Sequence, residues 1–126
     1  MGYESRIFVV NKYESRINEK PYGEKLAVLD MSKCDYEFVE LFDKKTDCKI
    51  YEFGADEPIQ KDNYGDELTE CDLRTAYLWL AEERMNCIAE NKEFYRRYSL
   101  LYSIVSDLME NTNWQHENIV LVHYGY

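Results

Sequence analysis

The chain has 126 residues and a formal net charge of −10 at pH 7, from 25 acidic and 15 basic residues, while 45% of its residues are hydrophobic. A disordered acidic tail lacks the apolar residues that offset the entropy of an ordered chain, so this composition predicts one folded domain over residues 1–126. The charge argues against direct binding of nucleic acid, which depends on Lys and Arg. No apolar run reaches the roughly 18 residues of a membrane span.

The first half of the chain predicts strands around one short helix. β-branched and aromatic residues cluster at residues 6–11 and again at residues 25–30, which predicts two strands. Apolar residues at helical spacing predict a short helix over residues 35–42, with Asp35 at its N-cap. Residues 48–53 alternate between polar and apolar, which predicts a third, half-exposed strand, and residues 57–65 predict a weak fourth strand.

The second half predicts two longer helices and a final strand. Apolar residues from Leu73 to Ile88 share one face of a helix over residues 72–90, and Asn91 is expected to cap a second helix that ends near residue 111. Residues 118–124 are apolar on both faces, which is typical of a strand in the middle of a sheet. The order predicts an α+β fold. Its mostly antiparallel sheet has four to five strands, the last inserted between earlier ones, and the two longer helices pack on one face.

The residues that bind zinc in proteins are scattered and form no CxxC or HxxxH pair. They are Cys34, Cys48, Cys71, Cys87, His116 and His123. One interpretation is that the cysteines are buried or idle thiols. The other is a structural zinc assembled from distant segments, because Cys34 follows the second predicted strand, Cys48 opens the third and His123 lies near the end of the last. Asp30 is then the expected fourth ligand, with Cys71 as its alternative.

No catalytic signature is present, since the chain lacks a nucleophile elbow, a Ser/His/Asp order and a phosphate-binding glycine loop. We therefore expect a binding protein and no enzyme. An anionic folded domain suits a basic protein surface, above all one that holds nucleic acid. The 12 tyrosines fit such an interface, although they also fit replacement of Phe in a small core. The expected contacts are carboxylates of the acidic stretch 56–70 and of the helix that follows it: Asp56, Glu57, Asp62, Asp66, Glu67, Glu82 and Glu83.

Short segments along nearly the whole chain carry a resemblance to known proteins. They are Met1-Gly-Tyr-Glu-Ser-Arg-Ile7, Thr46-Asp-Cys48, Tyr64-Gly-Asp66, Tyr95-Arg-Arg97 and Val122-His-Tyr-Gly-Tyr126. Together they resemble a group of small proteins from bacteriophages and prophages of gut Firmicutes. That group by itself implies no activity, but some small acidic phage proteins of this size are anti-CRISPR inhibitors, and the chain resembles a type II inhibitor.

This resemblance implies an inhibitor that binds a type II CRISPR effector nuclease with its guide RNA. Inhibition would be stoichiometric, through protein contact that hinders loading of target DNA. The expected location is the cytoplasm of a host bacterial cell, in agreement with the lack of a secretory signal in residues 1–11. We expect a monomer or weak dimer. The alternative is a small phage metal-dependent enzyme acting on a host component, which would keep an open coordination position on its metal.

Overall fold

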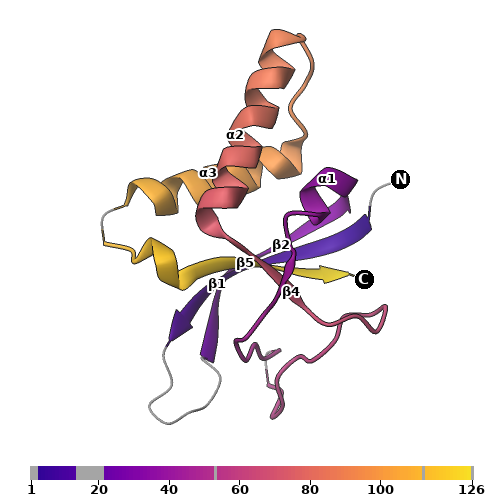
Figure 1. Cartoon of the computed structure of the whole chain (residues 1–126), viewed down its shortest axis with the longest axis vertical. Coiled ribbons are helices and arrows are strands. Elements are labelled where there is room, and N and C mark those ends of the chain that lie inside the picture. The colour runs from indigo at the N-terminus through magenta and orange to yellow at the C-terminus, as the bar shows by residue number, and fades with distance from the viewer. Residues whose placement is uncertain (1–2, 14–21, 53, 112, 126) are drawn as a thin grey trace.

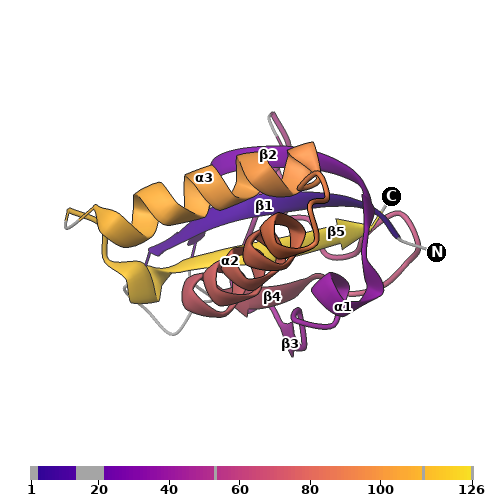
Figure 2. The ribbon, with the colours of Figure 1, turned by 90° about the horizontal axis from the view of Figure 1, so that it is seen from above.

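Five strands form one antiparallel sheet in the order β2-β1-β5-β4-β3. The computed structural model describes residues 3–13, 22–52, 54–111 and 113–125. The strands are β1 (Tyr3–Tyr13), β2 (Tyr22–Cys34), β3 (Lys44–Lys45), β4 (Thr69–Asp72) and β5 (Ile119–Gly125). The helices are α1 (Tyr36–Val39), α2 (Leu73–Ala89) and α3 (Arg96–Glu110), and a 3-10 turn, η1 (His116–Asn118), precedes β5. The helices share one face of the sheet, which confirms the predicted α+β architecture (Figure 1, Figure 2).

The last strand lies at the centre of the sheet, as its sequence predicts. β5 pairs with β1 on one side and with β4 on the other, so that Val122 lies between Phe8 and Glu70. All of residues 119–123 are buried. A strand in this position needs apolar side chains on both faces, because each face meets its own core.

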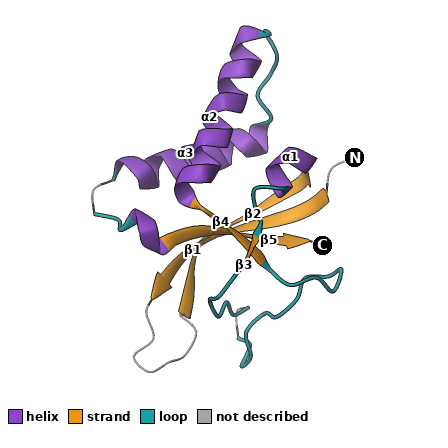
Figure 3. Cartoon of the chain, viewed as in Figure 1, coloured by secondary structure: helices purple, strands orange, loops and turns teal. Residues whose placement is uncertain are grey.

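Each face of the sheet carries a separate apolar core. On the helix face, Ile7, Val9 and Leu121 pack with Phe38 of α1, Leu80 of α2 and Leu101 of α3. On the other face the core consists of Phe8, Val10, Cys48, Ile50, Leu68, Val120 and Val122. This second core is covered by the long connection between β3 and β4, which runs beneath the sheet in Figure 3.

Two of the predicted strands are wrong in position. Residues 48–52 do not form a strand and contribute only isolated bridges, from Lys49 to Tyr22 and from Tyr51 to Pro58, while residue 53 lies outside the described residues. Residues 57–65 likewise form no strand. The sheet instead uses β3 and β4, which flank this segment. Residues 48–52 alternate between polar and apolar because Cys48 and Ile50 pack into the second core, although this segment is not a strand of the sheet.

Helix α2 begins as predicted but extends past the core that it covers. The Asp72 side chain caps it by accepting a hydrogen bond from the Thr75 backbone N–H at 3.1 Å. Leu73, Ala76 and Leu80 are buried, whereas the predicted core residue Ile88 is 60% exposed. The far half of the helix projects away from the sheet (Figure 1), so its apolar residues have no core to enter.

The predicted role of Asn91 is also wrong, because this residue ends α2 and does not begin α3. Asn91 has a φ of 55°, the left-handed conformation that commonly follows a helix. The Lys92 N–H donates to the Cys87 carbonyl at 2.8 Å and the Asn91 N–H donates to the Ile88 carbonyl at 3.2 Å. These two bonds form a Schellman motif, and α3 starts five residues later, at Arg96.

Candidate functional site

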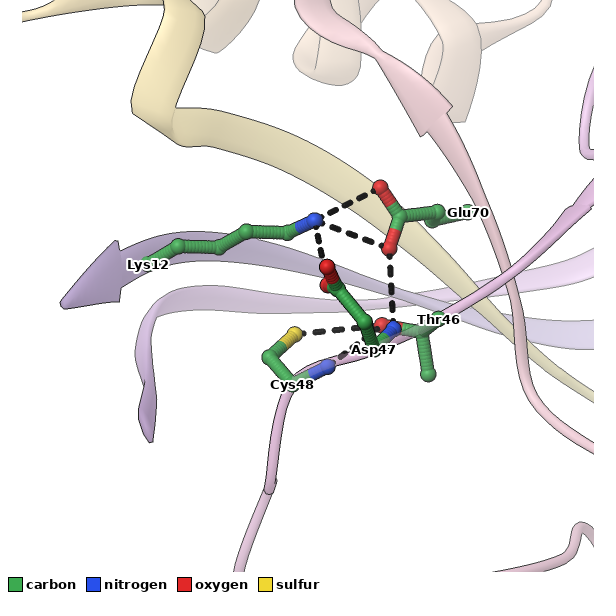
Figure 4. Close-up of polar contacts among 5 residues, drawn as sticks. All are labelled: Lys12, Thr46, Asp47, Cys48 and Glu70. Atoms are coloured by element: carbon green, nitrogen blue, oxygen red, sulfur yellow. Dashed lines mark hydrogen bonds and ion pairs between the residues drawn. The ribbon is translucent and has the colours of Figure 1, made fainter. Parts of the chain in front are cut away.

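A polar cluster of the sheet is centred on Lys12, whose side chain is largely withdrawn from solvent. Its Nζ donates to both carboxylate oxygens of Glu70 on β4, at 3.0 and 2.8 Å, and to Asp47 Oδ1 at 2.7 Å (Figure 4). The Glu70 side chain is only 5% exposed, whereas that of Asp47 is 52% exposed. Beside them, Thr46 Oγ1 lies 3.1 Å from Cys48 Sγ. We call these five residues the Lys12 cluster.

The charges of the Lys12 cluster stabilise one another. Burial by itself would lower the pKa of Lys12, but the hydrogen bonds and negative charges of Asp47 and Glu70 outweigh it and raise that pKa. Burial would raise the pKa of Asp47, and Lys12 reverses this and lowers it. Burial raises the pKa of the Cys48 thiol, which therefore stays protonated at neutral pH. The cluster ties β1, β4 and the chain after β3 together, and its thiol is a poor nucleophile.

The same cluster contains donor atoms of the kind that bind metals. Among the residues that the structure describes, Asp47, Cys48 and Glu70 form the one group of three His, Cys or carboxylate ligands whose donor atoms all lie within 4.8 Å of one another. Carboxylate and thiolate ligands suit Zn²⁺. However, the Lys12 ammonium already pairs with two of these three residues, Asp47 and Glu70. A metal ion would have to displace this ammonium.

The structure does not bring the four predicted zinc ligands together. Cys34 belongs to the core on the helix face and Cys48 to the core on the opposite face. Asp30 is exposed, and its carboxylate lies 3.6 Å from Arg97 of α3. The alternative ligand Cys71 is buried in the helix-face core. All four cysteines are free thiols. Tetrahedral zinc holds its ligands within about 2.3 Å of the metal, so these residues do not fit one common site, and zinc binding stays an untested prediction.

His123 is buried, within a small polar cluster that the sequence did not reveal. Ser5 on β1 is fully buried, and its Oγ lies 2.6 Å from His123 Nε2. A hydrogen bond from Ser5 also partly opposes the effect of burial on Cys34, whose pKa is raised to about 11. Burial lowers the pKa of His123, an effect that the charge of Asp62 opposes. A serine beside a histidine can act as a nucleophile, yet this pair is enclosed between β1 and β5 and serves the packing of the sheet.

An acidic surface lies where α1 meets the projecting part of α2. Phe38 of α1 packs against Trp79 of α2 with ring centroids 5.0 Å apart, which sets the two helices side by side. Burial, and then the charges of four neighbours, raise the pKa of Glu83. We define the acidic surface as Glu83 and these four neighbours: Asp35, Glu37, Glu82 and Glu90. Within the described residues, Lys92 is the one cation paired with any of them, at 2.9 Å from Glu90.

The predicted contact residues divide between this surface and the connection before β4. Glu82 and Glu83 belong to the acidic surface. Asp56, Glu57 and Asp66 are exposed on the connection, and Glu67 pairs with Lys45 at 2.6 Å. Asp62 is engaged within a turn, where its carboxylate accepts hydrogen bonds from the backbone N–H groups of residues 64, 66 and 125. The sequence did not indicate Asp35 and Glu37 as contact residues, because their proximity to α2 depends on tertiary packing.

No helix among the described residues is both long and apolar enough to cross a membrane. Comparison of the chain with protein-family models, with curated proteins and with solved structures finds no match. Function is therefore inferred from the residues of this chain.

Proposed function

We propose that this protein is an anti-CRISPR inhibitor. It binds a type II CRISPR effector nuclease, loaded with guide RNA, in the cytoplasm of a host bacterial cell. One protein molecule blocks one effector by contact, and the contact hinders loading of target DNA. The observation that carries the proposal is the acidic surface on α1 and α2, in a chain whose net charge is −10.

The acidic surface is suited to a cationic partner. Its five carboxylates repel one another, and the raised pKa of Glu83 is partly a consequence of that repulsion. Lys or Arg side chains on a partner would relieve the repulsion, while the charges would also steer the approach and raise the association rate. The two helices that carry the surface are joined by the contact between Phe38 and Trp79.

The effector is a partner of complementary, positive charge. Its guide RNA and target DNA strand pair in a positively charged channel that is recognised by shape and backbone. An anionic domain bound at or near this channel would compete with the incoming DNA.

A mixing experiment tests the proposal directly. Purified protein is added in steps to an effector–guide complex, and DNA binding and cleavage are then measured. Loss of both should be complete near one molar equivalent, and inhibition should weaken as salt increases. Cleavage that falls at a small fraction of an equivalent would instead indicate an enzyme acting on the effector. If several type II effectors neither bind the protein nor lose activity, the proposal is wrong.

Two triple variants of equal charge separate a specific surface from overall charge. The first reverses Glu37, Glu83 and Glu90 to Lys on the acidic surface. The second makes the same change in net charge at exposed carboxylates elsewhere: Asp107, Glu110 and Glu117. We expect the first variant to weaken inhibition at least tenfold more than the second. Equal weakening would show that net charge alone acts, and that the acidic surface is not the contact.

A further inference from the structure

A second exposed feature combines aromatic rings with carboxylates, at the end where β1 and β2 form a hairpin. Tyr22 stacks on Tyr51 with ring centroids 5.8 Å apart and planes at 24°, and Tyr22 is 51% exposed. The two rings line a recess of about 580 Å³ with Glu24, Glu52 and Lys25. We call Tyr22, Tyr51, Glu24 and Glu52 the Tyr–Glu recess. Core packing does not explain it, because Tyr22 stays half exposed.

The chain fixes the position of these rings firmly. Gly23, next to Tyr22, donates its backbone N–H to the Lys49 carbonyl at 2.8 Å, which draws the segment carrying Tyr51 against the start of β2. A Cβ at Gly23 would lie 2.9 Å from Val10 Cγ1 and 3.1 Å from Ile50 Cγ1. Glycine is thus required for this close approach. The Tyr–Glu recess is therefore held by the second core of the sheet.

The charges of the recess are suited to a cation. Glu24 accepts a hydrogen bond from Tyr13, the residue opposite Tyr22 across the hairpin. Glu52 is 55% exposed and lies 3.7 Å from the Lys25 ammonium, which is a loose contact. Lys25 itself lies over the Phe8 ring, 5.5 Å from its centroid. The recess thus offers a pair of stacked rings, of which Tyr22 is half exposed, and two carboxylates, while its resident lysine has an aromatic partner of its own.

We propose that the Tyr–Glu recess binds an arginine side chain presented by a protein partner. A guanidinium stacks on an aromatic face and donates to carboxylates in its own plane, and the recess offers both groups together. Lysine meets this combination less well, because its ammonium is a compact and strongly hydrated charge. Only the identity of the protein that carries this arginine rests on the proposed function.

The recess is separate from the acidic surface. The hairpin end of β1 and β2 lies at one side of the molecule and α1 at the other, in both Figure 1 and Figure 2. The two features can therefore be altered one at a time. An effector that contacts both would gain affinity from two contact regions, one set by many charges and the other by a single guanidinium.

The first test uses small probes and does not need the effector. N-acetyl-L-arginine amide and N-acetyl-L-lysine amide are each titrated into the whole protein, and NMR signals of the tyrosine rings are followed. We expect saturable shifts at Tyr22 and Tyr51, with the arginine probe binding at least threefold more tightly. The variant Tyr22→Leu, which keeps bulk but lacks a π face, should bind it about tenfold more weakly, whereas Tyr64→Leu should bind it normally. Equal binding of both probes, or unchanged binding by Tyr22→Leu, would overturn the proposal.

The second test uses the effector and separates the two proposals. If the effector binds, Tyr22→Leu should weaken the complex about tenfold and Glu52→Gln should weaken it less. An effector complex unchanged by both variants contradicts the arginine contact while the proposed function stands. If no effector binds but the arginine probe still selects the recess, the proposed function fails and the recess remains an arginine site.

Discussion

Replacing Lys12 with methionine should cost the protein a large part of its stability. The change keeps an unbranched apolar stem and removes the ammonium that bonds Glu70 at 2.8 and 3.0 Å. Glu70, with a side chain only 5% exposed, would be left as a buried carboxylate without its cation. Removing one partner of a buried ion pair costs about 3–5 kcal/mol. Because the Lys12 side chain retains 16% exposure, we expect about 3 kcal/mol, or roughly 10 °C in the melting temperature.

The assay is urea unfolding of four proteins: wild type, Lys12→Met, Glu70→Gln and the double variant. The double variant should be at least about 1.5 kcal/mol more stable than the sum of the single losses predicts, since residues in one network couple. Asp47→Asn serves as the control, because an ion pair with a half-exposed carboxylate contributes at most about 1 kcal/mol. If the single losses add without coupling, or if Lys12→Met unfolds like wild type, the pair is not a stabilising buried ion pair.

Three further predictions concern the imidazole, the metal ligands and the hairpin. The pKa of His123 is lowered in the folded state, so the unfolded chain takes up the proton first as pH falls below about 6.5. The free energy of unfolding should therefore decrease toward acid, by no more than about 1.4 kcal/mol per pH unit. Urea unfolding at pH 7.5 and 5.5 should show a smaller loss for His123→Gln than for the wild type. An equal loss would contradict the lowered pKa of His123. Added Zn²⁺ should raise the melting temperature of Lys12→Ala, in which the carboxylates of Asp47 and Glu70 have lost their cation beside Cys48, and should leave that of the wild type unchanged. The reverse pattern would show that the ammonium does not exclude the ion. Gly23→Ala should lose about 1–3 kcal/mol in urea unfolding, because its methyl group meets two fully buried side chains, and wild-type stability would show that the hairpin relaxes freely.

The parts of the fold that could be predicted are those whose signal is local. β5 is apolar on both faces, and α3 buries Tyr98, Leu101, Val105 and Leu108 at helical spacing. β4 carries no such signal, because its buried Glu70 is acceptable only beside Lys12, 58 positions away in the chain. Asn91 can cap a helix or follow one, and the sequence does not distinguish these roles until the start of α3 is known.

The same reasoning explains the outcome at the candidate site. The burial of His123 follows from the alternation of β5, so it could be predicted. The faces on which Cys34 and Cys48 lie could not, because Cys48 was assigned to a strand over residues 48–53 that does not form. The acidic surface was identified only in its α2 half, since α1 and α2 are joined by the contact of Phe38 with Trp79, a pairing with no pattern in the sequence.

The central position of β5 has a consequence for how the protein is made. β1 and β2 pair with each other, as do β3 and β4, and among the described strands β5 is the one that pairs with both halves of the sheet. During synthesis the halves emerge from the ribosome first and must wait for residues 119–125 before either core closes. Such long-range pairing slows folding and leaves apolar strands exposed to other nascent chains in the meantime. Loss of these seven residues would thus remove the strand that pairs with both halves of the sheet, together with apolar side chains of both cores.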